Sequence, residues 1–295
     1  MPTFKKRLIV TFLGVAAGLA AWPVVELILA RQAAFPSYLV FNIVFGCIFG
    51  VILGIFFGSG EGIIAGDAGR AASGALTGAV VGLLGGIAGF LIGQAALFLF
   101  GGIFFRSYAS FRTIGLPLSR AIGWAFMGII IGMSEGIRAR ASKKIVMGIL
   151  GGCIGGMLGG FSIEYLKLFF PELIYARLAG LVLFGALIGL FYSIIEEQLS
   201  FGVLQVLNGR FKGKEFFINQ HKLRIGGGKN NDICLPGCDL AERHAVISAQ
   251  RKDVIIRRAA DNLRLLVNEQ DVPERILKYE DVIKIGRVKL FYKQG

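Results

Sequence analysis

The stretch KLRIGGGKNNDICLPGCDLAERHAVIS, residues 222–248, decides the fold class of the last third of this chain. Apolar and polar residues alternate in 222–226 and 245–248, and this two-residue period is typical of half-buried β-strands. Turn formers, Asn230-Asn231 and Pro236-Gly237, separate the two runs. The stretch therefore predicts short strands joined by turns.

The same alternation continues on both sides of this stretch. It recurs in 215–219, 253–258, 263–267 and 282–292. Several short strands at such intervals predict a β-sandwich. We assign the sandwich to 215–295 and expect a linker at 201–214, which contains Asn208-Gly209, Lys212 and Lys214.

Three short motifs in this order resemble the forkhead-associated (FHA) family: Ile225-Gly226-Gly227, Asn231-Asp232-Ile233 and Arg243-His244-Ala245. The segment 279–286, followed by 288–291, is similar to the terminal hairpin of that family, and 266–268 is similar to the strand before it. The resemblance implies an all-β sandwich of two sheets that reads phosphothreonine in partner proteins.

Three recognition positions depart from the family pattern. In FHA domains an Arg follows Ile-Gly and a Ser lies three residues before the His, and these side chains hold the phosphate. Here the two positions are Gly227 and Ala241. The family's Asn-Gly pair, which holds the peptide backbone, falls near Asn262 without a clean match. A phosphate is held best by the two-pronged guanidinium of Arg, so the usual phosphate grip is missing.

The resemblance still assigns roles to the loops. Gly226 and His244 correspond to structural residues, and the partner-binding loops contain Gly227, Lys229, Asn231, Arg243 and Asn262. Lys229, Arg243 or Arg224 could replace the missing Arg as a point charge, whereas Glu242 adds repulsion. We expect protein docking that does not need phosphate, with weak binding of a Ser/Thr-phosphorylated partner as the second interpretation.

The first 200 residues have the composition of a membrane protein. The whole chain is 55% hydrophobic and 17% charged and contains 43 Gly, and most of the apolar excess precedes residue 200. Crossing a bilayer takes roughly 20 apolar residues. Runs of suitable length lie at 8–30, 37–57, 75–105, 121–137, 145–170 and 178–199, of which the fourth is short. We therefore expect a six-helix transmembrane domain at 1–200.

An even number of spans puts both termini on one side of the membrane. Eight cations are expected on that side: Lys5, Lys6, Arg7, Arg70, Arg138, Arg140, Lys143 and Lys144. Five are expected on the other: Arg31, Arg106, Arg112, Arg120 and Arg177. The excess of cations predicts cytoplasmic termini in a multi-pass protein of the bacterial inner membrane.

The spans also pair into three tandem hairpin repeats, at about 5–62, 69–136 and 139–197. The second helix of each pair ends in a small residue, another four residues on, and Glu three residues further: Gly54, Gly58, Glu61; Gly128, Gly132, Glu135; Gly189, Ser193, Glu196. Small residues four apart allow helix backbones to approach closely in lipid. We favour packing within one bundle and keep homo-oligomerisation as the alternative.

The repeated Glu predicts a ring of charges. A carboxylate at a helix C-terminus is opposed by the helix dipole, so Glu61, Glu135 and Glu196 need cationic partners or water. We expect Lys6, Arg70 and Arg140, which begin the three hairpins, to supply them. Glu26 lies within the first span, where a carboxylate is a candidate functional residue, but it also lies close to the outer interface, which favours a solvated helix end at least as much. No basic residue lies beside it in a relay pattern.

Several functions are excluded by the residues available. The formal net charge of +13 favours anionic lipid, at about 1 kcal/mol per cation near the surface, but no nucleic-acid recognition pattern appears. Cys234 and Cys238 lack the second ligand pair that structural zinc needs. Gly226–Lys229 lacks the spacing of a phosphate loop. With two His in the chain and no catalytic arrangement, we expect neither an enzyme nor a cofactor or metal site.

The sequence therefore predicts an integral membrane adaptor or scaffold that presents an FHA-like domain to a protein partner, in bacterial signalling or assembly. The alternative is a membrane transporter or channel that its FHA-like domain regulates. A third interpretation is a structural scaffold that forms oligomers through its glycine-rich helix faces.

Overall fold

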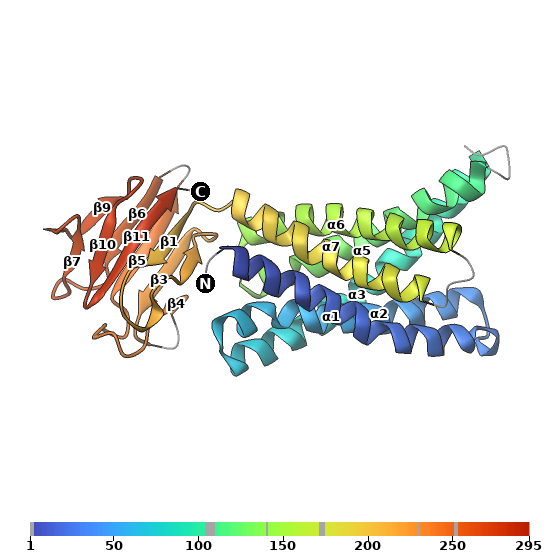
Figure 1. Cartoon of the computed structure of the whole chain (residues 1–295), viewed down its shortest axis with the longest axis horizontal. Coiled ribbons are helices and arrows are strands. Elements are labelled where there is room, and N and C mark those ends of the chain that lie inside the picture. Colours follow the sequence, from blue (N-terminus) through green and yellow to red (C-terminus); the bar gives the residue numbers. More distant parts are fainter. Residues whose placement is uncertain are drawn as a thin grey trace. The chain divides into compact units, whose positions relative to one another are not determined.

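The computed structural model describes residues 3–103, 110–139, 141–170, 175–228, 231–250 and 253–294. It divides into two compact units, of which Lys6–Glu196 is helical and the other contains the β-sandwich of Glu197–Gly295 (Figure 1). Arg106, Arg140 and Lys229, three cations named above, lie outside the described residues.

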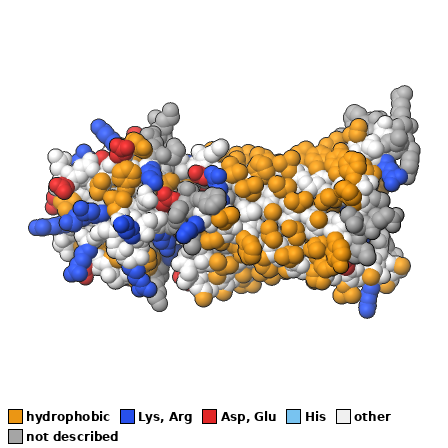
Figure 2. Space-filling view, in the orientation of Figure 1, with side chains coloured by type: hydrophobic (Ala, Val, Ile, Leu, Met, Phe, Trp, Pro, Cys, Tyr) orange, Lys and Arg blue, Asp and Glu red, His pale blue; other side chains and the backbone are white. Residues whose placement is uncertain are grey.

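The helical unit contains the six predicted apolar helices, all long and apolar enough to cross a membrane. Their bounds are α1 Thr3–Ala30, α2 Tyr38–Ala65, α3 Ala68–Ile103, α5 Leu116–Arg138, α6 Ser142–Phe169 and α7 Ala176–Gln198. Two short helical segments accompany them, η1 at Gln32–Ala34 and the π-helix η2 at Phe111–Gly115. Hydrophobic side chains dominate the visible surface of this unit (Figure 2).

The fourth span is longer than the sequence predicted. The expected run at 121–137 begins after Arg120, but in the structure η2 continues into α5 and the candidate span covers Phe111–Arg138, 28 residues. Arg120 Nη1 donates to Glu164 Oε2 at 2.8 Å. Because this carboxylate compensates the charge that interrupts the apolar run, Arg120 can lie inside a helix of the bundle.

Glycines bring several pairs of helices into backbone contact. In α2 and α3, an added Cβ at Gly54 would overlap the carbonyl oxygen of Gly78, and one at Gly78 would overlap that of Gly54. The same reciprocal contact joins Gly132 of α5 to Gly148 of α6, and Gly14 of α1 to Gly185 of α7. Lipid gives apolar helices no hydrophobic reason to associate, so contact between small residues stabilises such bundles through van der Waals packing.

Large side chains fill the centre of the bundle. Phe49, Trp124, Met127, Phe184 and Ile188 are all buried in one cluster. The rings of Trp124 and Phe184 lie 4.7 Å apart, and those of Phe49 and Trp124 lie 5.4 Å apart. The middle of the helical unit is therefore apolar and closely packed.

The sandwich has two sheets, in the strand orders β2-β1-β11-β10-β7-β8 and β4-β3-β5-β6-β9. The first sheet contains β1 Gly202–Val206, β2 Glu215–Phe217, β7 Leu265–Val267, β8 Gln270–Asp271, β10 Val282–Ile285 and β11 Val288–Gln294. The second contains β3 Lys222–Gly226, β4 Ile233–Cys234, β5 Ala245–Gln250, β6 Asp253–Arg258 and β9 Glu274–Ile276. β3 and β4 pair in parallel, with Ile225 opposite Ile233.

Alternate residues of the two sheets form the core between them. Leu204, Ile225, Ile247, Ile256 and Ile283 are each fully buried there. This arrangement confirms the predicted two-sheet sandwich, since four of these five inward side chains lie in runs that the two-residue period marked, and Leu204 is the exception.

The expected linker at 201–214 is wrong. Residues 202–206 form β1, which lies inside a sheet between β2 and β11. Leu204 and Val206 are buried in the core, so this segment carries the inward face of a strand. Asn208-Gly209, taken for linker residues, begin the turn between β1 and β2, which contains η3 at Gly209–Phe211.

The glycine contacts predict a position-specific cost in the bundle. Gly54→Ala should lower the free energy of unfolding by about 1–3 kcal/mol, because its Cβ meets the backbone of α3, which cannot yield locally. Gly60→Ala, in the same helix, is the matched control, since its Cβ meets only Leu13 Cδ1 at 3.4 Å. The measurement is SDS-induced unfolding in mixed micelles. Equal unfolding midpoints for the two variants would contradict the role of this contact.

Candidate functional site

Two loops of the sandwich meet at the FHA-like motif, the β3–β4 loop at 227–232 and the β4–β5 loop at 235–244. Gly226 ends β3, and a Cβ on it would overlap the carbonyl oxygen of Glu242. The amide of Gly227 donates to the Ala241 carbonyl at 2.9 Å, and that of Gly228 donates to the Glu242 carbonyl at 3.1 Å. The close approach that requires glycine at 226 therefore aligns the two loops side by side.

Asn231 joins these two loops through hydrogen bonds of its side chain. Its side chain is buried, and Nδ2 donates to the Gly228 carbonyl at 2.8 Å and also to the carbonyl of Glu242. One amide group thus satisfies acceptors from both loops, which stabilises their contact because buried carbonyls without a donor are costly.

His244 connects the β4–β5 loop to the loop that precedes β7. Its ring is buried, Nδ1 accepts from the Ala241 amide at 3.4 Å, and Nε2 lies 3.0 Å from the Arg264 carbonyl. A ring nitrogen that accepts leaves the other to carry the proton, so Nε2 donates to Arg264. This geometry holds the two loops together and leaves neither nitrogen for chemistry on a substrate.

Two further predicted loop residues face solvent. Arg243 and Asn262 are exposed, as is Glu242. In the described parts of the chain, Arg243 makes no ion pair or side-chain hydrogen bond. Arg243 is therefore available to a partner, whereas the nearby Arg287 is paired with Asp239 at 2.7 Å.

The two positions that distinguish this surface from a phosphate-binding FHA site are direct neighbours. Gly227 and Ala241 are joined by their backbone hydrogen bond, and neither carries a side chain that could donate to a phosphate. A Cβ at Gly227 would lie 3.0 Å from the Leu240 carbonyl oxygen, so the two loops are close together here, with limited room for a side chain at position 227. We call the surface formed by Gly227, Ala241 and Arg243 the apical surface. Asn262 lies in the loop before β7, which His244 joins to the β4–β5 loop through Arg264.

The helical unit carries the predicted charges at the end where α1 begins. Lys6 Nζ donates to Glu196 Oε1 at 2.8 Å, and the Glu196 side chain is only 2% exposed. Glu135 pairs with Arg138 at 2.8 Å. Glu61 pairs with Arg138 at 3.0 Å and with Lys144.

Lys6 is therefore the partner expected for one Glu, Arg70 has a different partner, and Arg140 lies outside the described residues. Arg70 interacts with Asp67, whose Oδ1 accepts from the Arg70 amide at 3.0 Å and whose Oδ2 lies 3.5 Å from Nε. Asp67 precedes α3 and holds Arg70 locally at the start of that helix. Arg138 is the cation that pairs with Glu135, because it lies one helical turn beyond it. Arg138 also reaches Glu61, 77 residues away in the chain.

At the opposite helix ends, two carboxylates have partners that the sequence did not reveal. Glu26 Oε2 accepts from Arg177 at 2.9 Å, in contrast to the predicted solvated Glu26. Glu164 accepts from Arg120 at 2.8 Å and from Lys167 at 3.4 Å. Lys167 is three residues from Glu164 and could have been found by its helical spacing, whereas Arg177 is 151 residues from Glu26.

The last third of the chain matches one protein-family model, described as the cytoplasmic domain of an inner membrane component of T3SS, over residues 205–295. A comparison of the whole chain with curated proteins found no match.

Solved structures of FHA domains resemble the same region. One, studied for phosphothreonine-dependent FHA interactions, is 22% identical, and the match covers 32% of this chain and 96% of that chain with a TM-score of 0.30. The FHA domain of the CT664 protein from Chlamydia trachomatis is 19% identical, with 32% and 97% covered and a TM-score of 0.30. The cytoplasmic domain of the T3SS sorting platform protein PscD from P. aeruginosa is 17% identical, with 32% and 79% covered and a TM-score of 0.30.

The sandwich topology, the motifs at 225–245 and the family match agree with one another. The chain therefore ends in an FHA-like domain that follows six apolar helices and is similar to the cytoplasmic domain of a T3SS inner-membrane component.

Proposed function

We propose that this protein is an integral membrane adaptor that recruits a protein partner through the apical surface without needing phosphate on that partner. The observation that carries the proposal is the neighbouring pair Gly227 and Ala241, where side chains that grip phosphate would have to stand. The loops around this pair keep their hydrogen bonds, so the surface retains its shape while its phosphate donors are absent.

The chemistry of the apical surface favours a peptide or protein with modest charge. Arg243 supplies one exposed cation and Glu242 beside it supplies one exposed anion. A phosphate carries nearly two negative charges at neutral pH and is held best by several converging donors. Backbone groups and Arg243 suit a carboxylate or a main-chain segment better than a dianion that Glu242 repels.

The helical unit is proposed to anchor this domain in the inner membrane of a bacterium, with both termini in the cytoplasm. Six apolar helices and the excess of cations at the α1 end support this orientation. The likeness of residues 205–295 to the cytoplasmic domain of an inner-membrane component supports the same side for the sandwich.

Three tandem hairpins are proposed as the plan of the bundle. Support comes from the glycine contacts, which join the second helix of each proposed hairpin to the first helix of the next: α2 to α3, α5 to α6, and α7 back to α1. These contacts join equivalent helices of the proposed repeats, as repeats arranged around one axis would require. Their registers differ by about one helical turn, because Gly132 aligns with Gly58 and Gly185 lies four residues before Gly189.

Transport is less well supported than anchoring. The cavity among Lys6, Glu61, Glu135 and Glu196 has a volume of only about 30 Å³. The buried cluster that contains Phe49, Trp124 and Phe184 packs the interior of the same unit. A path for a polar solute would need water through this apolar cluster, so we interpret the ion pairs as structural.

The first test is capture of the partner. Full-length protein in mild detergent should recover the same partner from untreated lysate and from lysate treated with alkaline phosphatase. Arg243→Glu should reduce recovery at least about tenfold if this cation contacts the partner, since removing a charged hydrogen bond typically costs 1.5–3 kcal/mol. Lys222→Glu, at the other end of β3, is the matched control and should leave recovery unchanged. Loss of the partner after phosphatase treatment would contradict the proposal.

The second test restores the missing side chains. The parent protein should not bind a phosphothreonine peptide in preference to its unphosphorylated form, whereas the double variant Gly227→Arg/Ala241→Ser should bind the phosphorylated form about 10- to 100-fold more tightly than the parent does. Isothermal titration calorimetry measures both affinities. Gly227→Lys/Ala241→Ser is a control, because a point charge lacks the two-pronged geometry. Preferential binding by the parent would disprove phosphate independence.

The third test asks whether the buried ion pair is structural. Lys6→Met or Glu196→Met alone should lower the free energy of unfolding by about 3–5 kcal/mol, because each removes the opposite charge at 2.8 Å from a largely buried group. The double variant should recover most of this loss, since both charges are then absent. SDS-induced unfolding measures the stability of the parent, the two single variants and the double variant. Proton flux by the parent in liposomes, lost in the single variants at unchanged stability, would instead support transport.

A further inference from the structure

The helical unit contains a cavity of about 270 Å³ at the end where α1 and α6 finish and α2 and α7 begin. Pockets for small molecules usually measure about 300–1,000 Å³, so this cavity suits a small ligand. It lies at the opposite helix ends from Lys6 and Glu196, and the ion pairs proposed as structural do not line it.

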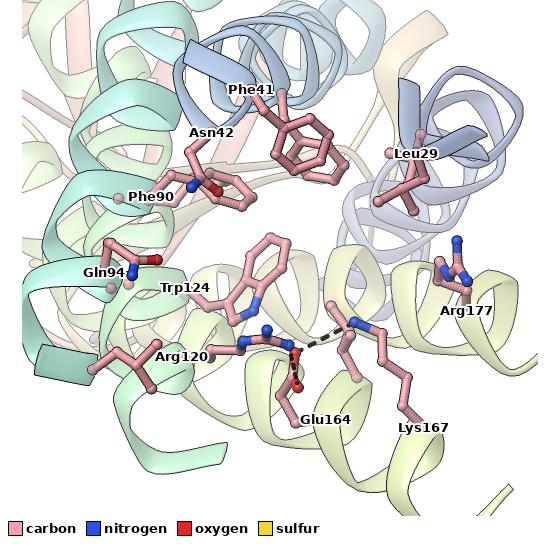
Figure 3. Close-up of a pocket in the computed structure, with 18 of the residues that line it drawn as sticks. Leu29, Phe41, Asn42, Phe90, Gln94, Arg120, Trp124, Glu164, Lys167 and Arg177 are labelled. Atoms are coloured by element: carbon pink, nitrogen blue, oxygen red, sulfur yellow. Dashed lines mark hydrogen bonds and ion pairs between the residues drawn. The ribbon is translucent and has the colours of Figure 1, made fainter. Parts of the chain in front are cut away.

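One side of the cavity is aromatic. Phe41 and Phe45 of α2, Phe90 of α3 and Trp124 of α5 line it. The rings of Phe45 and Phe90 lie 4.9 Å apart, and those of Phe90 and Trp124 lie 5.4 Å apart. Figure 3 shows Trp124 between this aromatic side and the charged residues. An apolar group of a ligand would be desolvated against these rings.

The other side carries more cations than anions. The cations that line the cavity are Arg120, Lys167 and Arg177, and their side chains are 38–39% exposed. The Glu164 carboxylate, 5% exposed, is shared between Arg120 and Lys167, and Glu26 pairs with Arg177. Three cations thus face two carboxylates, and Lys167, at 3.4 Å, has the longest of these contacts.

A neutral polar group also lines the cavity without a partner. The side chain of Gln94, in the apolar helix α3, makes no hydrogen bond with any residue that the structure describes. Figure 3 shows its amide near Phe90, on the same side of the drawn residues as Asn42. A polar group within an apolar helix is costly unless it is hydrogen-bonded, so Gln94 is an available donor and acceptor for a ligand.

We propose that this cavity binds a small amphipathic anion, with its head group on Lys167 and Arg120 and its apolar segment against Phe41, Phe90 and Trp124. The shared chemistry is a single anionic group attached to an aliphatic or aromatic segment. A free carboxylate amphiphile and the head-group region of an anionic phospholipid both have this chemistry, and the experiment below separates these sources. The site is independent of partner docking at the apical surface.

The two tryptophans of the chain make a direct assay possible, because Trp124 lines the cavity and Trp22 does not. Trp22 Nε1 is buried and makes no hydrogen bond with the described residues, so Trp22→Phe removes a buried donor that has no acceptor among them. Trp124 is then the single tryptophan whose fluorescence is measured. Full-length Trp22→Phe protein in discs of zwitterionic lipid is titrated with 11-bromoundecanoate, whose bromine quenches tryptophan, and in parallel with 11-bromoundecanol.

The carboxylate should quench Trp124 saturably, and unbrominated undecanoate should restore the fluorescence. Lys167→Gln should weaken this binding about tenfold, and Lys167→Arg should retain it, because the head group loses or keeps a charged donor. Arg112→Gln is the matched control, since this exposed cation of η2 does not line the cavity. Repeating the titration in discs with anionic phospholipid identifies the source: weaker apparent binding indicates competition by lipid, and unchanged binding indicates a free amphiphile.

Equal quenching by the carboxylate and the alcohol would overturn the proposal. Unchanged binding by Lys167→Gln would also overturn it. If Lys167→Gln failed to fold, the competition experiment still decides, because it uses only the Trp22→Phe protein. Failure of undecanoate to restore the fluorescence would show that the quenching is not site-specific.

Discussion

Backbone-to-backbone contact between glycine-lined helices is the constraint on which the helical unit depends. At Gly54 with Gly78, Gly132 with Gly148 and Gly14 with Gly185, no Cβ fits between the chains. Such contacts bring α2 to α3, α5 to α6 and α7 to α1, and they determine which helix ends meet. The ion pairs of Glu61 and Glu196 follow from this packing, because neighbouring helices supply their cations, whereas Glu135 pairs with Arg138 of its own helix.

A comparable constraint shapes the FHA-like domain. Gly226 lets β3 approach Glu242, and the loops that follow are held by backbone hydrogen bonds, by Asn231 and by His244. None of these interactions involves a side chain at 227 or 241. The loops therefore keep their arrangement without phosphate-binding side chains at these two positions, which supports the proposed docking that does not need phosphate.

The two ends of the helical unit differ in how fully their charges are compensated. At the α1 end, Lys6, Arg138 and Lys144 meet Glu196, Glu135 and Glu61 in a compact cluster with little space. At the other end, Glu164 is shared by two cations beside an aromatic cavity of about 270 Å³. A fully paired cluster suits a structural role, whereas excess positive charge next to an apolar space suits an anionic ligand.

The sequence by itself determined the six apolar helices, the two-sheet sandwich and the absence of phosphate-gripping side chains, because these follow from local composition, periodicity and motif order. It missed β1, since Gly202–Val206 is short and its pairing with β11 joins residues about 90 positions apart in the chain. Only the tertiary structure assigned Arg138 to Glu61 and Arg177 to Glu26, and only it revealed the cavity beside Trp124. The physical reason is that side-chain partners and empty space depend on which helices pack together, and a local pattern does not record that.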